Sequence, residues 1–318
     1  MKNALIFGVT GQDGAYLSKF LLDKGYNVSG TFRRTSHKCF ESLDQLQIFD
    51  QVNRIKADVT DPSSIQSAIR QSQPDEIYNL AAQSFVGASF QQPILTADIT
   101  AIGTLRVLDA LKENASDAKF YQASASEMFG NSPGIKNENS AFKPRSPYGT
   151  AKVFAHQIAN HYREAYNIFA CCGILFNHES CFRGIEFVTR RISWNLARIK
   201  FKKIEKFTLG NIHARRDWGF AGDYVESMWL MLQQKEPSDY VIATGKSHSV
   251  ESFLEMSFEY SGLGDWHDYV EINEKYIRPR DIDNLVGDAS KANKILNWRP
   301  EMNFENLVKL MIDEDIKL

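Results

Sequence analysis

The N-terminus of the chain places a short apolar strand directly before a glycine-rich turn and a helix. Residues 4–7 (Ala-Leu-Ile-Phe) precede Gly8-Val9-Thr10-Gly11-Gln12-Asp13-Gly14, and residues 15–22 have the composition of a helix. Glycines spaced three apart permit a tight turn and let backbone N–H groups approach a diphosphate at the positive end of the helix. The segment therefore predicts the first unit of a dinucleotide-binding sheet, with an ordinary strand–turn–helix connection as the alternative.

The first half of the chain continues to alternate strands and helices. Apolar segments predict strands at 3–8, 27–32, 53–57, 76–80, 118–122 and 168–175, with helices at 12–23, 62–72, 93–114 and 147–166. Such alternation is typical of a parallel sheet covered by helices on both faces. We therefore expect an α/β fold: a Rossmann-type doubly wound parallel sheet with a smaller C-terminal α/β substrate-binding lobe. The expected boundaries are 1–176 for the first domain and 177–318 mainly for the second, with part of 217–246 a candidate to return to the first.

Composition narrows the class of protein. The 318 residues are 43% hydrophobic and 24% charged, which is ordinary for a soluble protein with one large core. A net charge of −2 argues against a nucleic-acid binder, and no apolar run approaches the length of a membrane span. Met1 leads almost directly into a strand, so no signal peptide is expected. The cysteines lack metal-ligand spacing and fit a reducing cytoplasm: Cys39, Cys171, Cys172 and Cys181.

Two arginines follow the second predicted strand, at Arg33 and Arg34. An acidic residue there would bind the ribose hydroxyls of NAD, whereas arginines suit the 2′-phosphate of NADP. Further along, Asp58-Val59 follows the third strand and Leu80-Ala81-Ala82 follows the fourth. In open parallel sheets ligands bind beyond the carboxyl ends of the strands. The sequence thus predicts an NADP site there, with a solvated basic turn as the alternative for the arginine pair.

A second set of polar residues predicts the chemistry. Ser124-Ala125-Ser126-Glu127 ends an apolar stretch, and Tyr148 and Lys152 lie four residues apart on a predicted helix, hence on one face. A nearby ammonium lowers the pKa of a phenol, so we expect Lys152 to let Tyr148 act as a base near neutral pH. Tyr-x3-Lys arises often by chance, and it gains weight here from the glycine-rich turn upstream.

Together these segments resemble the GDP-mannose 4,6-dehydratase family, which consists of extended short-chain dehydrogenases/reductases acting on nucleotide sugars. The similarity runs nearly end to end, through residues 8–14, 33–34, 78–84, 144–148, 173–180, 187–190, 209–211, 216–219 and 278–279. Residues 177–180 and 216–219 are the most diagnostic. The resemblance implies a cytoplasmic homodimer or homotetramer that holds NADP tightly and binds a GDP-sugar, without a metal, nucleic acid or membrane.

The reaction implied by the resemblance is a redox-neutral dehydration. Tyr148 removes the proton of the sugar 4-hydroxyl while hydride leaves C4, and Lys152 contacts the nicotinamide ribose and tunes Tyr148. Glu127 removes the C5 proton and helps to expel the 6-hydroxyl as water, with Ser126 beside it. Hydride then returns to C6, so that GDP-mannose, the leading substrate, becomes a GDP-4-keto-6-deoxy-hexose.

The resemblance also assigns contact residues. Those for the cofactor are Gly8, Thr10, Gly11, Gln12, Asp13, Gly14, Arg33, Arg34, Asp58, Val59, Leu80, Ala81, Ala82, Tyr148, Lys152, His178 and Arg183. Those for the substrate are Ser84, Ala125, Glu127, Asn177, Val188, Arg190, Leu209, Gly210, Arg216, Arg278 and Asp281. The arginines suit a diphosphate because a guanidinium makes bidentate hydrogen bonds.

The chain departs from the family at Ala125, where a threonine hydroxyl normally assists the reacting 4-oxygen. Losing one such hydrogen bond costs on the order of a hundredfold in rate. Three explanations stay open: a slower enzyme that uses water or Ser126, an enzyme for another sugar (a GDP-heptose or a GDP-N-acetylhexosamine), or a catalytically silent homologue. A C4 reductase or epimerase of the same fold is a further alternative, against which Glu127 argues. Other departures are expected on the sugar side and favour an altered substrate: Phe85, Gly87, Cys181 and Phe182.

Overall fold

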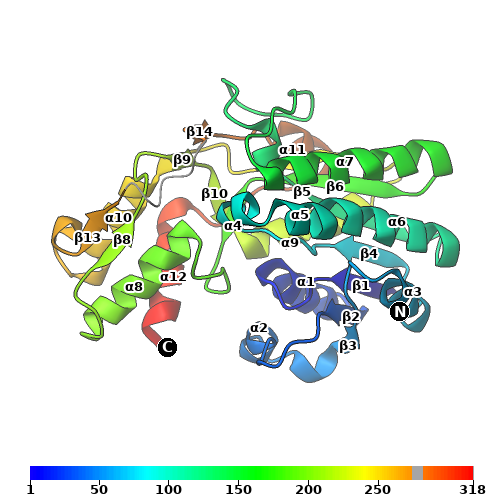
Figure 1. Ribbon diagram of the computed structural model, residues 1–318, viewed down its shortest axis with the longest axis horizontal. Coiled ribbons are helices and arrows are strands. Elements are labelled where there is room, and N and C mark those ends of the chain that lie inside the picture. Colours follow the sequence, from blue (N-terminus) through cyan, green and yellow to red (C-terminus); the bar gives the residue numbers. More distant parts are fainter. Residues whose placement is uncertain (274–281, 318) are drawn as a thin grey trace.

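A seven-stranded sheet forms the centre of the larger lobe (Figure 1). The computed structural model describes residues 1–273 and 282–317. The strand order is β11-β6-β5-β4-β1-β2-β3, and every neighbouring pair is parallel. The strands are β1 (Asn3–Phe7), β2 (Asn27–Phe32), β3 (Asn53–Lys56), β4 (Glu76–Asn79), β5 (Lys119–Ala125), β6 (Ala170–Leu175) and β11 (Tyr240–Ile242). The chain order reverses between β1 and β4, as in a doubly wound sheet, so the predicted Rossmann-type class is confirmed.

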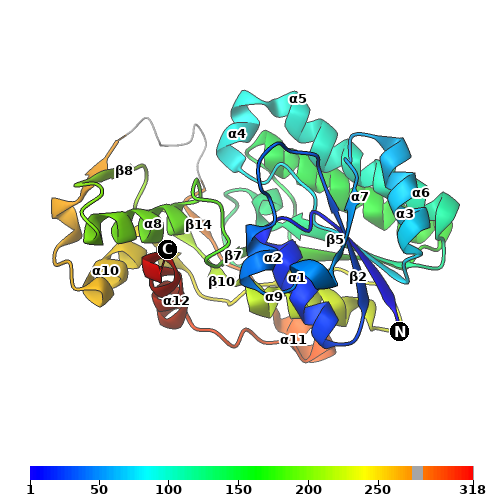
Figure 2. The same ribbon diagram turned by 90° about the horizontal axis from the view of Figure 1, so that it is seen from below.

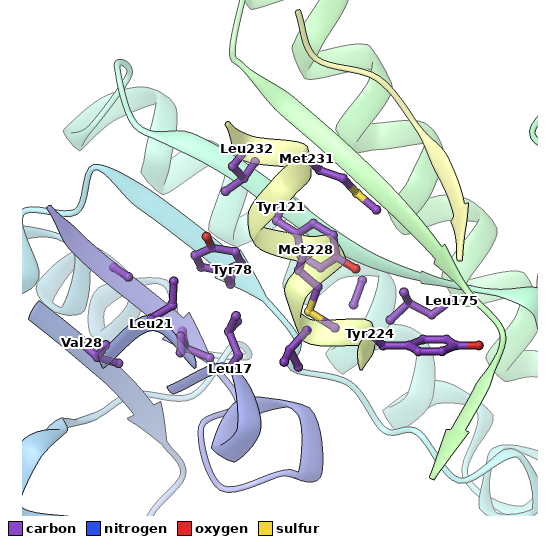
Figure 3. Packing of buried hydrophobic residues seen from close by; sticks show 14 of the residues in the cluster. Leu17, Leu21, Val28, Tyr78, Tyr121, Leu175, Tyr224, Met228, Met231 and Leu232 are labelled. Atoms are coloured by element: carbon purple, nitrogen blue, oxygen red, sulfur yellow. The ribbon is translucent and has the colours of Figure 1, made fainter. Parts of the chain in front are cut away.

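Helices cover both faces of this sheet, and each face has its own apolar core. On one face, α1 (Gln12–Asp23) and α9 (Ala221–Leu232) pack against the strands, and Figure 3 shows Leu17 and Met228 from these helices near Tyr78 and Tyr121 of the sheet. The other face carries α3 (Pro62–Ser72), α6 (Gly103–Asn114) and α7 (Pro147–Tyr166). Burial of these two apolar layers fixes the sheet, and with it the positions of its strand ends.

Local sequence signals set where the site-bearing helix begins. The Ser146 hydroxyl accepts a hydrogen bond from the Gly149 amide at 3.0 Å, and Pro147 occupies the first helical position of α7. A serine cap followed by proline is a strong helix start. The cap therefore fixes Tyr148 in the first turn of α7, at the carboxyl edge of the sheet.

The smaller lobe lies beside the carboxyl edge of the sheet and has its own core (Figure 2). Its helices α8 (Val188–Lys200), α10 (Val250–Ser261) and α12 (Phe304–Lys317) enclose apolar side chains such as Leu196, Phe253 and Met311. Its short strands are β7 (Asn177–Glu179), β8 (Phe207–Leu209), β9 (Arg215–Arg216), β10 (Trp218–Phe220), β12 (His248–Ser249), β13 (Val270–Ile272) and β14 (Asn284–Leu285). The chain returns to the larger lobe through α9, β11 and α11 (Ser290–Leu296).

The remaining elements are short. They are α2 (Glu41–Gln45), α4 (Val86–Gln91), α5 (Pro93–Thr96), a π-helical segment (Ala97–Ile102) and the 3₁₀ segments Phe49–Gln51, Ser126–Phe129 and Trp266–Asp268. The predicted helix 93–114 thus consists of α5, the π-helical segment and α6. The predicted strand 118–122 instead runs from Lys119 to Ala125, which carries it to the site. Within the described ranges, no helix is long and apolar enough to cross a membrane.

Candidate active site

A cavity of about 700 Å³ lies between the two lobes, at the carboxyl ends of β4, β5 and β6. It brings together residues that the sequence scatters over more than a hundred positions. Those predicted for catalysis, cofactor or substrate that line it are Asp13, Leu80, Ala82, Ser84, Ala125, Ser126, Glu127, Tyr148, Lys152, Asn177, His178, Arg183, Val188, Leu209, Gly210 and Arg216. One cavity therefore holds the proposed catalytic residues, most of the proposed substrate contacts and some of the proposed cofactor contacts.

The glycine-rich turn has the backbone that a dinucleotide requires. Gly8 adopts φ +94°, and its Cα lies so close to the β4–α4 loop that a Cβ would be 3.2 Å from the Ala81 nitrogen. A Cβ on Gly14 would lie 2.3 Å from the Gly8 carbonyl oxygen, so α1 packs onto the turn only with glycine there. At Gly11, the N-cap of α1, no side chain caps the helix. This cradle fits a cofactor diphosphate at the helix N-terminus.

Other predicted cofactor residues lie around the same sheet edge. The Asp58 carboxylate accepts hydrogen bonds from the Thr60 amide (2.9 Å) and hydroxyl (2.8 Å), which fixes the turn after β3. Val59 is buried, and Arg33 and Arg34 are exposed after β2. The Gln12 side chain donates to the His178 carbonyl at 3.1 Å and so joins the glycine-rich turn to β7.

Tyr148 and Lys152 are both buried, with exposed fractions of 8% and 4%. The Lys152 ammonium donates to the Ala123 carbonyl at 2.6 Å and lies 5.8 Å from the centre of the Tyr148 ring. Burial lowers the pKa of Lys152 to about 8. Burial, and after it the Glu127 carboxylate, raises the pKa of Tyr148 above its usual range. The expected net lowering of this pKa is therefore wrong for the protein by itself, because burial outweighs the opposing charge of the Arg183 guanidinium.

At the end of β5, Ala125 gives the site a methyl group where the family has a hydroxyl. Ala125 is 9% exposed and packs with Val86 and Tyr148, next to the partly buried Phe90. The surroundings of the Tyr148 ring on this side are therefore apolar. The preceding hydroxyl, on Ser124, lies 3.0 Å from His156 Nδ1 and is held on α7.

Asp13 and His178 form an ion pair between the two lobes. The His178 Nε2 lies 2.8 Å from the Asp13 carboxylate, and its Nδ1 lies 2.7 Å from the Phe176 carbonyl oxygen. Burial disfavours the charged form of both residues, but the attraction between the two charges is stronger than this effect. The pKa of Asp13 is therefore lowered to about 2, and that of His178 is raised. The pair thus joins the glycine-rich turn to the first strand of the smaller lobe.

Three predicted substrate residues need separate comment. Arg190 points away from the cavity, because its guanidinium pairs with Asp315 of α12 at 2.9 Å and 2.6 Å. The next residue, Arg191, lines the cavity instead. The structure therefore gives Arg190 a role in joining α8 to α12 rather than in contacting a ligand. Arg278 and Asp281 lie outside the described residues.

The departures from the family pattern also divide into two groups. Phe85 and Gly87 line the cavity, and a Cβ on Gly87 would lie 2.9 Å from the Phe85 ring. Cys181 and Phe182 instead contact Tyr16 of α1, at 3.9 Å (sulfur to oxygen) and 5.1 Å (between ring centres). They do not line this cavity, so the expectation that all four lie on the sugar side is wrong for these two.

Sequence reasoning missed an aromatic contact that closes the cavity between the lobes. Phe85 meets Phe187, the N-cap of α8, edge-on at 5.5 Å, and the Arg183 guanidinium lies 3.6 Å from the centre of the Phe187 ring. Nothing local in the sequence indicates this contact, since its two rings come from different lobes.

Within the described ranges, no group of three or more His, Cys, Asp or Glu side chains is arranged to hold a metal ion.

A Rossmann-type sheet with tyrosine and lysine four residues apart, facing a carboxylate in the same cavity, defines a protein of the short-chain dehydrogenase/reductase class. Comparison with known proteins specifies the family. The sequence pattern described as GDP-mannose 4,6 dehydratase matches residues 5–311, and the chain belongs to this family.

Individual relatives agree with this placement. The chain is 53% identical to GDP-mannose 4,6 dehydratase 2 of Arabidopsis thaliana, over 100% of this chain and 87% of the relative. It is 46% identical to the GDP-mannose 4,6 dehydratase of Homo sapiens, over 99% of this chain and 91% of the relative. The crystal structure of dTDP-glucose 4,6-dehydratase from Bacillus anthracis in complex with NAD shares the fold, with a TM-score of 0.85, 19% identity and coverage of 98% of this chain and 96% of that one.

Proposed function

We propose that the chain is an NADP-dependent GDP-sugar 4,6-dehydratase, with GDP-mannose as the first candidate substrate. The observation that carries this proposal is the meeting of Tyr148, Lys152 and Glu127 in one cavity beside the glycine-rich cradle. The curated relatives named above, at 53% and 46% identity, supply the substrate class. A reductase or epimerase needs the tyrosine and lysine but no carboxylate for elimination, so Glu127 favours the dehydratase.

When bound, the nicotinamide would accept hydride from C4 of the sugar and donate hydride to C6. Tyr148 takes the proton of the sugar 4-hydroxyl at its phenolic oxygen. Its raised pKa makes the phenolate costly. Two cations lie nearby: Arg183, which lowers this pKa, and Lys152, whose ammonium lies 5.8 Å from the centre of the Tyr148 ring. The buried pair therefore carries out proton transfer at O4, away from bulk water.

Elimination of water falls to Glu127. Its carboxylate lines the cavity on the 3₁₀ turn that follows β5, near enough to Tyr148 to raise the pKa of the phenol. Once C4 is a ketone, the proton on C5 is acidic. Glu127 then takes that proton and returns it to the departing 6-hydroxyl, so the elimination needs no proton from solvent. When hydride adds to C6, C5 takes up one proton, which balances the proton that Tyr148 removed from O4.

The other end of the cavity fits the nucleotide. Asn177, Val188, Leu209, Gly210 and Arg216 line it from four segments of the smaller lobe. Arg216 is buried and anchored through hydrogen bonds to the Arg215 carbonyl (2.9 Å) and the Ile282 carbonyl (2.6 Å). An arginine fixed in this way is preorganised for a diphosphate.

NADP rather than NAD is the proposed cofactor because exposed Arg33 and Arg34 follow β2. Titration calorimetry on cofactor-stripped protein tests this choice. We expect tighter binding of NADP than of NAD, and a loss of that difference in an Arg33→Ser/Arg34→Ser variant. Equal affinities of the parent protein for both cofactors would refute it.

We also propose that a second copy of the chain packs on the α5–α7 face, giving a homodimer or, by further pairing, a homotetramer. A cavity of about 600 Å³ lies there between the 93–114 helical segment and α7. Large apolar side chains around it are exposed: Ile94 by 83%, Ile102 by 36% and Phe154 by 39%. An apolar surface of this kind is typical of a protein interface.

All four cysteines are free thiols, which supports the cytoplasm as the compartment.

The reaction is tested by incubating the purified protein with a panel of GDP-sugars and measuring product masses. Loss of one water supports the dehydratase, whereas gain of two hydrogens from added NADPH indicates a reductase. Ala125 favours a second candidate, a cofactor-binding homologue without catalysis. No mass change with any GDP-sugar, by protein that binds NADP, would support that candidate and contradict the first.

A further inference from the structure

The glycine-rich turn carries a carboxylate that faces the cavity. Asp13 lines the cavity, and its side chain is 21% exposed. One of its oxygens accepts a hydrogen bond from the Gln12 amide at 3.0 Å, and the other lies 2.8 Å from His178 Nε2. An anion is unexpected in a motif that otherwise offers N–H groups to a diphosphate. Its presence therefore needs a reason of its own.

The hydrogen bonds of His178 fix its charge. Its Nδ1 faces the Phe176 carbonyl oxygen at 2.7 Å, and this oxygen has no proton to donate. Its Nε2 faces Asp13, whose pKa is held at about 2. Both ring nitrogens must then donate, so His178 is an imidazolium. Arg183 is the other cation that lowers the pKa of Asp13, so the carboxylate stays ionised at any working pH.

Asp13 lines the same cavity as the catalytic residues Tyr148 and Lys152, and its charge acts on both of them. Behind the effect of burial, it contributes to raising the pKa of Tyr148, and it acts to raise that of Lys152. Hydride exchange has to take place beside these two residues, because Tyr148 handles the proton of the same oxidation. Oxidised nicotinamide carries a positive charge and reduced nicotinamide does not. A fixed carboxylate nearby therefore interacts more favourably with the oxidised ring.

We infer that Asp13, beyond the cofactor contact that the resemblance assigns to it, favours the oxidised nicotinamide over the reduced one, and that His178 limits how much of the Asp13 charge acts there. The inference rests on the proposed function in that the cofactor is a nicotinamide dinucleotide and exchanges hydride beside Tyr148. Its consequence is a bias towards giving hydride back to the sugar. An enzyme whose oxidation and reduction occur in one turnover benefits, because the reduced form does not accumulate.

The test compares the affinities of cofactor-stripped protein for NADP⁺ and NADPH at pH 7 by calorimetry. His178→Gln removes the cation and leaves the Asp13 charge uncompensated, so the preference for NADP⁺ should rise by about three- to tenfold, the scale of one partly screened charge interaction. Asp13→Asn/His178→Gln removes both charges, and its preference should fall below that of the parent. Asp23→Asn is the control, since that exposed carboxylate ends the same helix, pairs with Lys19 and lies outside the cavity lining, and its ratio should match the parent.

The ratio of the affinities for NADP⁺ and NADPH should be highest in His178→Gln, lower in the parent and lowest in the double variant. A purely structural role for the pair would weaken both cofactor forms together and leave the ratio unchanged, which would overturn the inference. Equal ratios in the single and double variants would also overturn it. A parent protein that binds neither form would end both this inference and the proposed function. The predicted order in a protein that converts no GDP-sugar would support the inference and leave the proposed function refuted.

Discussion

Replacing Ala125 by threonine tests the part of the site that departs most from the family. Ala125 ends β5 with extended backbone angles (φ −144°, ψ 146°), which a β-branched side chain adopts readily. The new hydroxyl would enter the apolar group of Val86, Phe90 and Tyr148, beside the oxygen that reacts. One restored hydrogen bond to developing charge is worth about 1.4–2.7 kcal/mol, or about ten- to a hundredfold in kcat. We therefore expect that gain on GDP-mannose with little change in KM.

The added atoms also have a cost that a matched variant measures. Ala125→Val has nearly the shape of threonine without the hydroxyl, and crowding in a packed cluster costs about 1–3 kcal/mol of stability. Denaturant unfolding of both variants measures the loss of stability that crowding causes in each. The ratio of their kcat values then gives the effect of the hydroxyl alone. Equal kcat values for the threonine and valine variants on GDP-mannose would refute the reasoning.

The same two variants bear on substrate identity. If the chain serves another sugar, both side chains should crowd that substrate and lower turnover on it. Only two of the four sequence departures support this explanation, because Phe85 and Gly87 line the cavity, whereas Cys181 and Phe182 contact Tyr16. A gain on GDP-mannose with no better substrate in the panel would exclude the altered-substrate explanation.

Four further predictions follow from individual contacts. Asp315→Ala leaves a buried arginine without its partner and should lower the free energy of unfolding by about 3–5 kcal/mol in denaturant, with a smaller loss for Asp315→Asn. Glu127→Gln should let reduced nicotinamide absorbance build up with GDP-mannose and block product, whereas Tyr148→Phe should show no such absorbance; product at the parental rate from Glu127→Gln would contradict its role. Since burial lowers the pKa of Lys152 to about 8, its charge is lost as pH rises through that value, so kcat/KM should fall on the alkaline side, and a flat profile to pH 10 would contradict this. Phe154→Asp, at an exposed position, should give a monomer in light scattering where the parent gives the proposed oligomer, with the far-ultraviolet circular dichroism unchanged.

Much of the architecture could be predicted because its signals are local. The glycine spacing, the alternation of strands and helices, and the Ser146-Pro147 helix start each act within a few residues. Together they placed Tyr148 and Lys152 on one buried turn of α7. The sheet class followed from the same alternation.

What could not be predicted depends on tertiary burial and partners. The pKa of Tyr148 is raised, whereas the sequence predicts that it is lowered, because the sequence does not show how far the phenol is removed from water. Arg190 and Arg191 are neighbours in a motif, and only the distant Asp315 decides which one turns from the cavity. The Phe85–Phe187 contact joins two lobes and leaves no periodic signal.

We propose that oxidation at C4, elimination by Glu127 and reduction at C6 occur in one cavity within a single turnover. This proposal is tested most directly with GDP-mannose deuterated at C4, in a mixture with undeuterated substrate carrying a ¹³C label. We expect a 4-keto-6-deoxy product in which the deuterium lies at C6 of the same molecule that lost it from C4. Deuterium that exchanges into the ¹³C-labelled product, or a product without deuterium at C6, would contradict hydride return within one turnover.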